Sequence, residues 1–297
     1  MPKDFYPMTM AELFDRALHV YKQSFWRQIA YGAIVSLIAF VGLFALSIIS
    51  VILMVSTGAS GFSVVLVVII AAAGVLLWLS VSSAGHILLA RHALYGHKAK
   101  ITVYQIPAVA LRVFSVFFAL IIAFLPIGFL AVLVFSVFIN APTINIWVLV
   151  IVGVLFSLVF YLFISVFSLA FPVAVFENKC FFAALSRAWA LVKGEFWKIV
   201  ATRVMWALIT FLLTSVLQGG LQIFTFALAM FPDIFGTSPT GAYGLITALG
   251  QIVGFLSIIA TIITTPLEGV FTSTMYFNQR IKKEGLDIDI ALGRLRL

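Results

Sequence analysis

Six long apolar runs, separated by short polar breaks, set the pattern of this chain. Each is at least as long as the roughly 20 residues that a helix needs to cross the hydrocarbon core of a bilayer. Since unpaired backbone groups are costly in lipid, runs of this length predict helices. They cover approximately residues 29–55, 62–90, 113–139, 146–171, 199–230 and 244–277. The pattern predicts an all-α polytopic membrane protein with six transmembrane helices in three hairpins.

Amphipathic segments precede the first and the fifth of these runs. Thr9 and Glu12 have the spacing of a capping box, which marks the start of a helix. Apolar residues then recur at helical spacing over 10–25, and again over 181–196. A helix with one apolar and one basic face lies in the headgroup plane of a bilayer. We therefore predict amphipathic interfacial helices on the cytoplasmic face.

The two amphipathic segments resemble each other, which indicates an internal repeat. Residues 16–27 read R-A-L-H-V-Y-K-Q-S-F-W-R, and residues 187–198 read R-A-W-A-L-V-K-G-E-F-W-K. A middle copy is weaker, because Pro107 falls in the first turn after the Thr102–Gln105 capping-box spacing. We predict a single membrane domain, residues 1–297, with pseudo-repeats at 9–90, 102–172 and 180–277. Residues 278–297 are expected to form a cytoplasmic tail.

Composition and charge strengthen this interpretation. Hydrophobic residues make up 64% of the 297 and charged residues 9%, whereas a soluble domain carries about a quarter charged residues. All 18 Lys and Arg fall in the N-terminus, 91–112, 179–203 and the C-terminal tail, and the three short loops hold only one acid, Asp233. The positive-inside rule then places both termini in the cytoplasm. The net charge of +8 is explained in this way, without a nucleic-acid partner.

Glu268 is the sharpest single candidate for a functional residue. It lies inside the sixth run, about 15 Å before Asn278 along a helix, and therefore near the middle of the membrane. An acid at that depth is costly unless it faces the bundle or water. It could be a proton or cation relay or a ligand contact, with Tyr161, Thr210 and Ser80 as neighbours. The alternative is a protonated acid that hydrogen-bonds to the backbone near Pro266 and only stabilises the bundle.

Four basic residues recur at matched places in two repeats: Arg16 and Lys22, and Arg187 and Lys193. Paired basic interfacial helices could converge on the phosphate of an anionic lipid. The alternative is general anchoring, in which long basic side chains extend toward an acidic leaflet. No metal site or cofactor is expected, since the single cysteine, Cys180, has no accompanying ligand cluster.

Three motifs resemble a known family. They are F-P-V-A-V-F-E-N-K at 171–179, A-L-S-R-A-W-A-L-V-K-G-E-F-W-K at 184–198 and Y-F-N-Q-R-I-K-K-E-G-L-D-I-D at 276–289. Together with M-T-M-A-E-L-F-D-R-A-L-H-V-Y-K at 8–22, they resemble the glycerophosphoryl diester phosphodiesterase membrane domain family of bacteria. The resemblance implies a multi-pass protein of the bacterial inner membrane with a lipid-related context. It implies no catalytic residue, because a catalytic barrel needs about 250 residues and the six spans use the chain.

These observations favour a non-catalytic membrane protein at the cytoplasmic leaflet. It would bind anionic membrane lipids, or support a membrane-protein partner in membrane homeostasis or transport. The alternative is a small transporter or channel that uses Glu268, because internal repeats and broken helices are typical of transporters. An intramembrane lipid enzyme ranks last: the sequence holds no Walker A, H-E-x-x-H or G-x-S-x-G motif, and Glu268 would have to meet His86 or Arg203 in a cavity.

Overall fold

A computed structural model describes residues 6–57, 61–95, 105–140, 146–230 and 239–285, and these residues are helical with no strand. Six of the helices in this part of the chain are long and apolar enough to cross a membrane. The predicted all-α architecture with six such helices, that of a multi-pass membrane protein, is therefore confirmed. In chain order the helices are α1 (Met10–Thr57), α2 (Gly61–Tyr95), α3 (Gln105–Asn140), α4 (Ile146–Phe167), α5 (Ala170–Phe176), α6 (Phe181–Val192), α7 (Phe196–Met230) and α8 (Pro239–Glu284).

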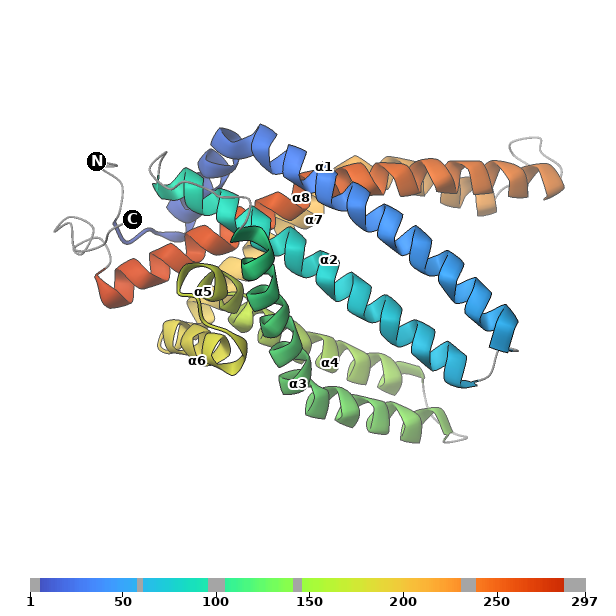
Figure 1. Ribbon diagram of the computed structural model, residues 1–297, viewed down its shortest axis with the longest axis horizontal. Coiled ribbons are helices and arrows are strands. Elements are labelled where there is room, and N and C mark those ends of the chain that lie inside the picture. Colours follow the sequence, from blue (N-terminus) through green and yellow to red (C-terminus); the bar gives the residue numbers. More distant parts are fainter. Residues whose placement is uncertain (1–5, 58–60, 96–104, 141–145, 231–238, 286–297) are drawn as a thin grey trace.

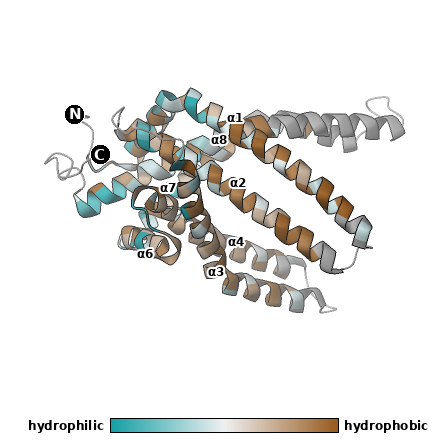
Figure 2. Cartoon of the chain, in the orientation of Figure 1, coloured by the Kyte–Doolittle hydropathy of each residue, from teal (hydrophilic) through white to brown (hydrophobic). Residues whose placement is uncertain are grey.

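The long helices pack together at one end of the molecule and diverge toward the other (Figure 1). The packed end carries the first turns of α1 and the last turns of α8 together with α5 and α6. It is also where the hydrophilic residues gather, whereas the diverging parts that can be described are mostly hydrophobic (Figure 2). We call it the charged end. This separation follows from the sequence. Basic residues occur only before the first pair of apolar runs, between one pair and the next, and after the last pair.

Helix α8 lies at the centre of this arrangement. Half of the residues in its most apolar 18-residue stretch are buried, against 6% of those in the corresponding stretch of α1. It contacts α1, α2, α5, α6 and α7. At the charged end the Trp206 ring of α7 stacks on the Phe271 ring of α8, with centroids 4.1 Å apart, and Phe14 of α1 packs on both rings. Burial at the charged end therefore holds the helices together, while their far parts remain free to contact lipid.

The start of α1 is fixed to α8 by hydrogen bonds. The predicted capping box is confirmed: the Thr9 backbone N–H donates to Glu12 Oε2 at 2.7 Å, and the Glu12 N–H donates to Thr9 Oγ1 at 3.4 Å. The Asn278 side chain bonds both the N–H and the carbonyl of Met8. Asn278 was expected at the start of a tail, but α8 continues through it to Glu284.

The two copies of the repeat fold differently. Helix α1 runs without interruption from Met10 to Thr57, so residues 10–25 are not a separate interfacial helix. In the second copy α6 ends at Val192, and Gly194 follows with a φ of 94°. That left-handed conformation is readily open only to glycine, and the first copy has Gln23 at the matching place. This one difference separates α6 from α7 and leaves α1 continuous.

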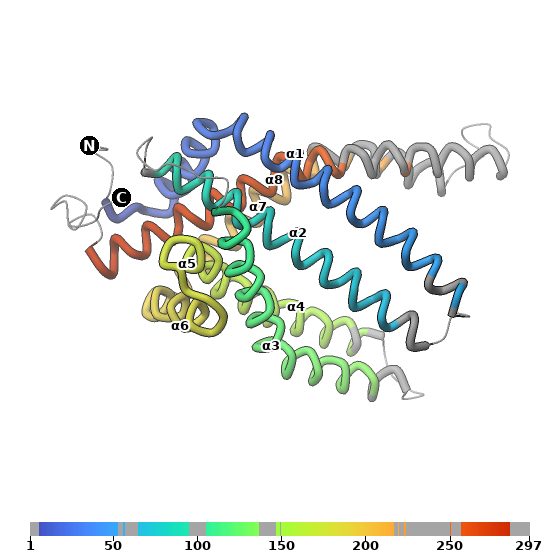
Figure 3. The backbone as a smooth tube through the Cα atoms, viewed as in Figure 1, coloured from blue at the N-terminus to red at the C-terminus, as the bar shows by residue number. Residues whose placement is uncertain are grey.

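The middle copy has no separate entry helix among the described residues. Thr102 lies outside them, and α3 begins at Gln105 and continues to Asn140, through Pro107 in its first turn. Helix α3 also contains Pro126, and its trace changes direction along its length (Figure 3). Pro266 lies inside α8 in the same way. A proline within a helix removes one backbone hydrogen bond and favours such a bend.

Gly85 gives a test of how closely α1 and α2 pack. A Cβ at this position would lie 2.0 Å from Tyr31 Cζ, and the Tyr31 hydroxyl donates to the Val81 carbonyl at 2.6 Å. We expect Gly85→Ala to displace Tyr31 and to lower the free energy of unfolding by about 1–3 kcal/mol. Thermal unfolding in detergent measures this. Gly42→Ala is the matched control, because a Cβ there meets nothing within 4 Å; equal stability of the two variants would contradict the packing.

Candidate functional site

Glu268 is paired with an arginine. Arg203 Nη1 on α7 donates to Glu268 Oε1 at 2.5 Å, and Trp206 Nε1 donates to Oε2 at 2.9 Å. Thr272, one turn further along α8, donates to Oε1 at 3.2 Å. The Arg203 side chain is 10% exposed and that of Glu268 45% exposed. Donors from two helices therefore hold the acid, in place of the contact near Pro266 that the sequence allowed.

Aromatic rings surround the arginine side of this pair. The guanidinium of Arg203 lies 5.6 Å from the centroid of the Phe271 ring, close enough for a cation–π contact. Phe271 stacks on Trp206, whose indole N–H already bonds the acid. A nearly buried guanidinium in such surroundings needs a counter-charge, because leaving it unpaired is costly. The arrangement explains why Arg203 and Glu268 lie among apolar neighbours on α7 and α8.

The pair lies closer to the charged end than to the far end of its helices. A straight helix measures about 44 Å from Pro239 to Glu268, and about 24 Å from Glu268 to Glu284. Arg203 is about 10 Å from the first residue of α7. The distance from Pro239 to Glu268 along α8 therefore exceeds the roughly 30 Å thickness of a hydrocarbon core.

Among the described residues, the other predicted neighbours of Glu268 form no hydrogen bond with it. The Thr210 hydroxyl donates to the Trp206 and Ala207 carbonyls of its own helix, at 3.0 and 3.1 Å. The Ser80 hydroxyl donates to the Leu76 carbonyl at 2.6 Å. Tyr161 is half-buried on α4, and no hydrogen bond joins its hydroxyl to Glu268 in the part of the chain that the structure describes. The polar cluster expected around Glu268 therefore consists of Arg203, Trp206 and Thr272.

His86 lies in a second buried polar contact. Its ring Nδ1 is 2.7 Å from Gln28 Oε1, and Gln28 Nε2 donates to the His86 carbonyl at 3.3 Å. The Tyr31 ring packs edge-on against the imidazole, with centroids 5.2 Å apart. A Cβ at Gly269 of α8 would lie 2.9 Å from the His86 Cβ. His86 thus joins α1, α2 and α8 by packing, and it does not meet Glu268.

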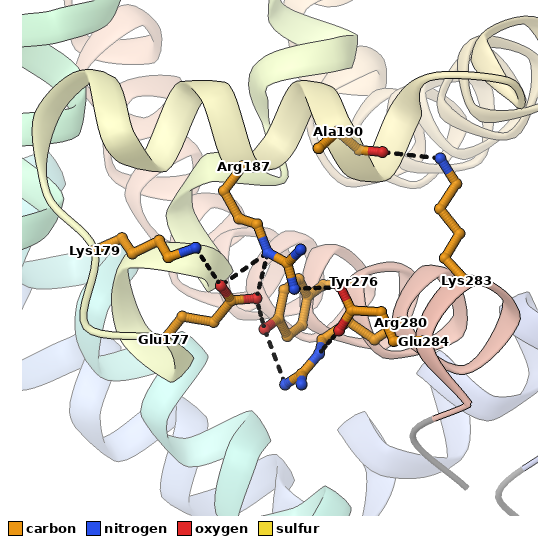
Figure 4. A network of polar contacts seen from close by, with 8 residues as sticks. All are labelled: Glu177, Lys179, Arg187, Ala190, Tyr276, Arg280, Lys283 and Glu284. Atoms are coloured by element: carbon orange, nitrogen blue, oxygen red, sulfur yellow. Dashed lines mark hydrogen bonds and ion pairs between the residues drawn. The ribbon is translucent and has the colours of Figure 1, made fainter. Parts of the chain in front are cut away.

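The largest charged cluster is a closed ring that the sequence did not predict (Figure 4). Arg187 of α6 bonds both oxygens of Glu177, at 2.9 and 3.1 Å, and also contacts Glu284. Arg280 bonds Glu284 at 2.9 Å, and the Tyr276 hydroxyl donates to Glu177 at 2.8 Å. Arg280 Nη1 closes the ring on the Tyr276 hydroxyl at 3.4 Å. These five residues, the charged ring, join the end of α5 to α6 and α8.

The charged ring brings together the three motifs that carry the family resemblance. Glu177 comes from 171–179, Arg187 from 184–198, and the other three residues from 276–289. In the sequence, the only signal for the ring is the presence of opposite charges in these motifs, because 97 positions separate Arg187 from Glu284. Lys179 adds a further ion pair to Glu177 at 3.1 Å.

Contacts within the ring shift the pKa values of Glu177 and Arg187, two members that lie outside the long apolar helices. Burial raises the pKa of Glu177, but hydrogen bonds from Tyr276, Lys179 and Arg187 and the charge of Arg187 outweigh it, so the pKa lies below its ordinary value of 4.5. Burial lowers the pKa of Arg187, but hydrogen bonds and charge from Glu177 and Glu284 outweigh it and raise the pKa above its ordinary value. Both groups are therefore charged at neutral pH.

The four predicted lipid contacts fall into two kinds. Lys22 and Lys193 are exposed. Arg16 is only half-exposed and has interactions within the chain, and Arg187 binds two carboxylates in the charged ring. The matching positions of the repeat are thus not equivalent in the fold.

Two exposed tryptophans lie near the charged ends of α1 and α7. The side chains of Trp26 on α1 and Trp197 on α7 are 79% and 73% exposed, and each is followed by an exposed basic residue, Arg27 and Lys198. Exposed tryptophan is enriched where a membrane meets water. A cavity of about 200 Å³ between α1 and the end of α2 is lined by Lys22, Trp26 and Arg27, among others.

The described residues hold no cluster of three or more His, Cys, Asp or Glu side chains that could bind a metal ion. Cys180 is a free, exposed thiol immediately before α6.

Comparisons with protein-family models, with curated proteins and with solved structures gave no match. The resemblance to the glycerophosphoryl diester phosphodiesterase membrane domain therefore stays a prediction that rests on the quoted motifs. Function has to be argued from the geometry.

Proposed function

We propose that this chain is a non-catalytic integral membrane protein that binds anionic lipid at its charged end. Its six long helices cross the membrane as three hairpins, with both termini in the cytoplasm and α6 at the cytoplasmic face. The motif resemblance adds the bacterial inner membrane as the location. The sorting of basic residues to one end supports the orientation, because cytoplasmic segments of membrane proteins are enriched in Lys and Arg.

One observation carries the proposal: Lys22 and Arg27 flank exposed Trp26 around a cavity between α1 and α2. The exposed indole supports a position of this cavity at headgroup level, where phosphates are found. Each basic residue near an anionic membrane surface contributes about 1 kcal/mol of attraction. Lys193, directly after α6, and Lys198 on α7 are further exposed basic residues at the charged end, whereas Arg187 binds Glu177 and Glu284 in the charged ring.

A transporter or channel receives less support from the geometry. The acid that suggested it, Glu268, is neutralised by Arg203 and lies toward the charged end of α8. Thr210 and Ser80 bond their own helices. An intramembrane lipid enzyme would need a cavity at Glu268 and Arg203, and the cavities described for this chain are lined by other residues. A membrane-protein partner remains compatible with lipid binding, through the apolar faces of the diverging helices.

The proposal predicts that Lys22→Gln with Arg27→Gln weakens binding to anionic lipid by roughly tenfold or more, since two attractions of about 1 kcal/mol are lost. The measurement is native mass spectrometry of the purified full-length chain with added phosphatidylglycerol and phosphatidylcholine. The charge-retaining pair Lys22→Arg with Arg27→Lys is the control and should bind as the wild type does. Equal binding of both lipids by the wild-type chain would overturn the proposal.

A further inference from the structure

A long apolar groove lies between α3 and α4. It measures about 690 Å³ and is lined by residues of α3, of α4 and of the first turn of α5. The rings of Phe124 on α3 and Phe160 on α4 bridge the two helices beside it, with centroids 4.7 Å apart. Both α3 and α4 belong to the six helices that are long and apolar enough to cross a membrane. The groove is therefore separate from the basic cavity between α1 and α2.

The lining of the groove suits an apolar ligand. Six of its residues are phenylalanines: Phe117, Phe124, Phe129, Phe160, Phe163 and Phe171. Among the lining residues only Ser168 has a polar side chain, and its hydroxyl already donates to the Ser165 carbonyl at 2.9 Å. A polar group that entered the groove would lose its hydrogen bonds to water and find no partner in exchange, which is costly.

The dimensions of the groove decide between two apolar occupants, a hydrocarbon chain and a helix. From Phe117 to Val132 the groove follows α3 for about 22 Å. Its volume over that length corresponds to a mean cross-section of roughly 30 Å², whereas a helix about 10–12 Å in diameter needs about 80 Å² or more. A partner helix is therefore too wide for the groove, and a single extended hydrocarbon chain is not.

The groove also passes a bend. Its α3 residues lie on both sides of Pro126, with Leu125 before it and Gly128 after it, and the trace of α3 changes direction along its length (Figure 3). A flexible chain can follow such a change of direction, whereas a rigid ring system such as a sterol cannot. An acyl chain reaches through one leaflet, about half of the 30 Å core, so the groove is long enough to hold one.

We propose that this groove binds one acyl chain of a membrane phospholipid. Contact with the phenylalanine rings holds the chain, because lipid tails are as apolar as these side chains and only closer packing distinguishes the groove from the surrounding bilayer. The site selects a lipid by its tail, whereas the basic cavity at Lys22 and Arg27 selects it by its headgroup. This inference rests on the proposed membrane-spanning arrangement of α3 and α4, and not on the preference for anionic lipid.

Gly128 offers a way to close the groove. A Cβ at this position would meet only the Phe124 ring, at 4.0 Å, so a larger side chain has room to extend into the groove. We expect Gly128→Leu to lower occupancy by the acyl chain about tenfold, because the new side chain takes the space of the ligand. Leu125→Trp enlarges a second lining residue and should have the same effect.

The probe is a phosphatidylcholine that carries a photoreactive diazirine in the middle of one acyl chain. The full-length chain is placed in phosphatidylcholine nanodiscs with this probe and illuminated, and mass spectrometry identifies the labelled residues. In the wild type we expect stronger labelling at Phe124 and Phe163 than at Phe40 and Phe44, two exposed residues of α1 that contact bulk lipid. An excess of sterol should not compete with the probe.

Gly42→Leu is the matched control, because Gly42 lines a different cavity, between α1 and α2, and a Cβ there meets nothing within 4 Å. It should leave labelling of the groove unchanged. Equal labelling of the groove and of α1, or unchanged labelling in both Gly128→Leu and Leu125→Trp, would overturn the inference. Competition by sterol would overturn the assignment to an acyl chain. Since phosphatidylcholine has no net charge, these outcomes are independent of the preference for phosphatidylglycerol, and either proposal can fail while the other stands.

Discussion

Replacing Glu268 by alanine is expected to destabilise the protein by about 3–5 kcal/mol, because it leaves the guanidinium of Arg203 nearly buried without a counter-charge. It also removes the acceptor for the indole N–H of Trp206. Glu268→Gln should cost less, since the amide oxygen still accepts a hydrogen bond. Thermal unfolding in detergent, followed by circular dichroism, gives the order of stability wild type, glutamine, alanine.

A double variant tests whether the loss of stability comes from the interaction between Arg203 and Glu268. Glu268→Leu with Arg203→Leu removes both charges and should recover most of the stability lost in either single variant, because it no longer leaves the nearly buried Arg203 guanidinium without its partner. The two single changes should therefore be strongly non-additive. Additive losses would show that the two side chains do not act on each other.

The same variants test the transporter alternative. If Glu268 has a structural role, Glu268→Gln in vesicles loaded with a pH-sensitive dye leaves proton flux at the level of the wild type. Loss of a wild-type flux with unchanged thermal stability would instead favour a relay at Glu268 and count against the proposed function.

Removal of the Arg187 guanidinium from the charged ring is the second substitution that we expect to have a large effect. Arg187→Ala deletes the bidentate contact to Glu177 and the contact to Glu284, so we expect a loss of about 2–3 kcal/mol. Arg187→Lys should fall between, since an ammonium keeps the charge but cannot bond both carboxylates in the same fork. Lys193→Ala, at the exposed end of α6, is the control and should change stability by less than about 0.5 kcal/mol.

Arg187 and Lys193 were both predicted to contact lipid. The comparison of their alanine variants therefore also distinguishes a role in packing from a role in lipid binding. If Arg187 acts in the ring, the loss is the same in neutral detergent and in anionic lipid. A loss seen only with anionic lipid would show that Arg187 binds headgroups, as its place in the repeat first indicated.

The ring also gives the stability a dependence on pH, and the sign follows from Glu177. Its pKa is lower in the folded chain than the ordinary 4.5, so its contribution is present above that value and is lost as the pH falls through the folded pKa. The raised pKa of Arg187 changes nothing at acid or neutral pH, because the group is already charged there. Glu177→Gln should therefore flatten the loss of thermal stability below about pH 4.5.

The sequence by itself determined the elements and their sorting. Apolar runs long enough to cross a bilayer can satisfy their backbone in lipid only as helices, so the six long helices followed from run length alone. The positions of the basic residues likewise separated a charged end from an apolar one. The Thr9–Glu12 capping box was predictable because it depends on residues three apart. Such features depend on residues that are close together in the chain, so the sequence pattern is enough to predict them.

Only the tertiary structure decided which side chains meet. Arg203 pairs with Glu268, and Arg187 closes a ring with Glu284, because of how far α6, α7 and α8 are rotated and shifted relative to one another. The period of a helix does not specify that offset, to which the packing of Trp206 on Phe271 contributes between α7 and α8. For the same reason the repeat misled: Arg16 and Arg187 match in sequence, but Gly194 breaks one copy at a place where Gln23 continues the other, so the two copies fold differently.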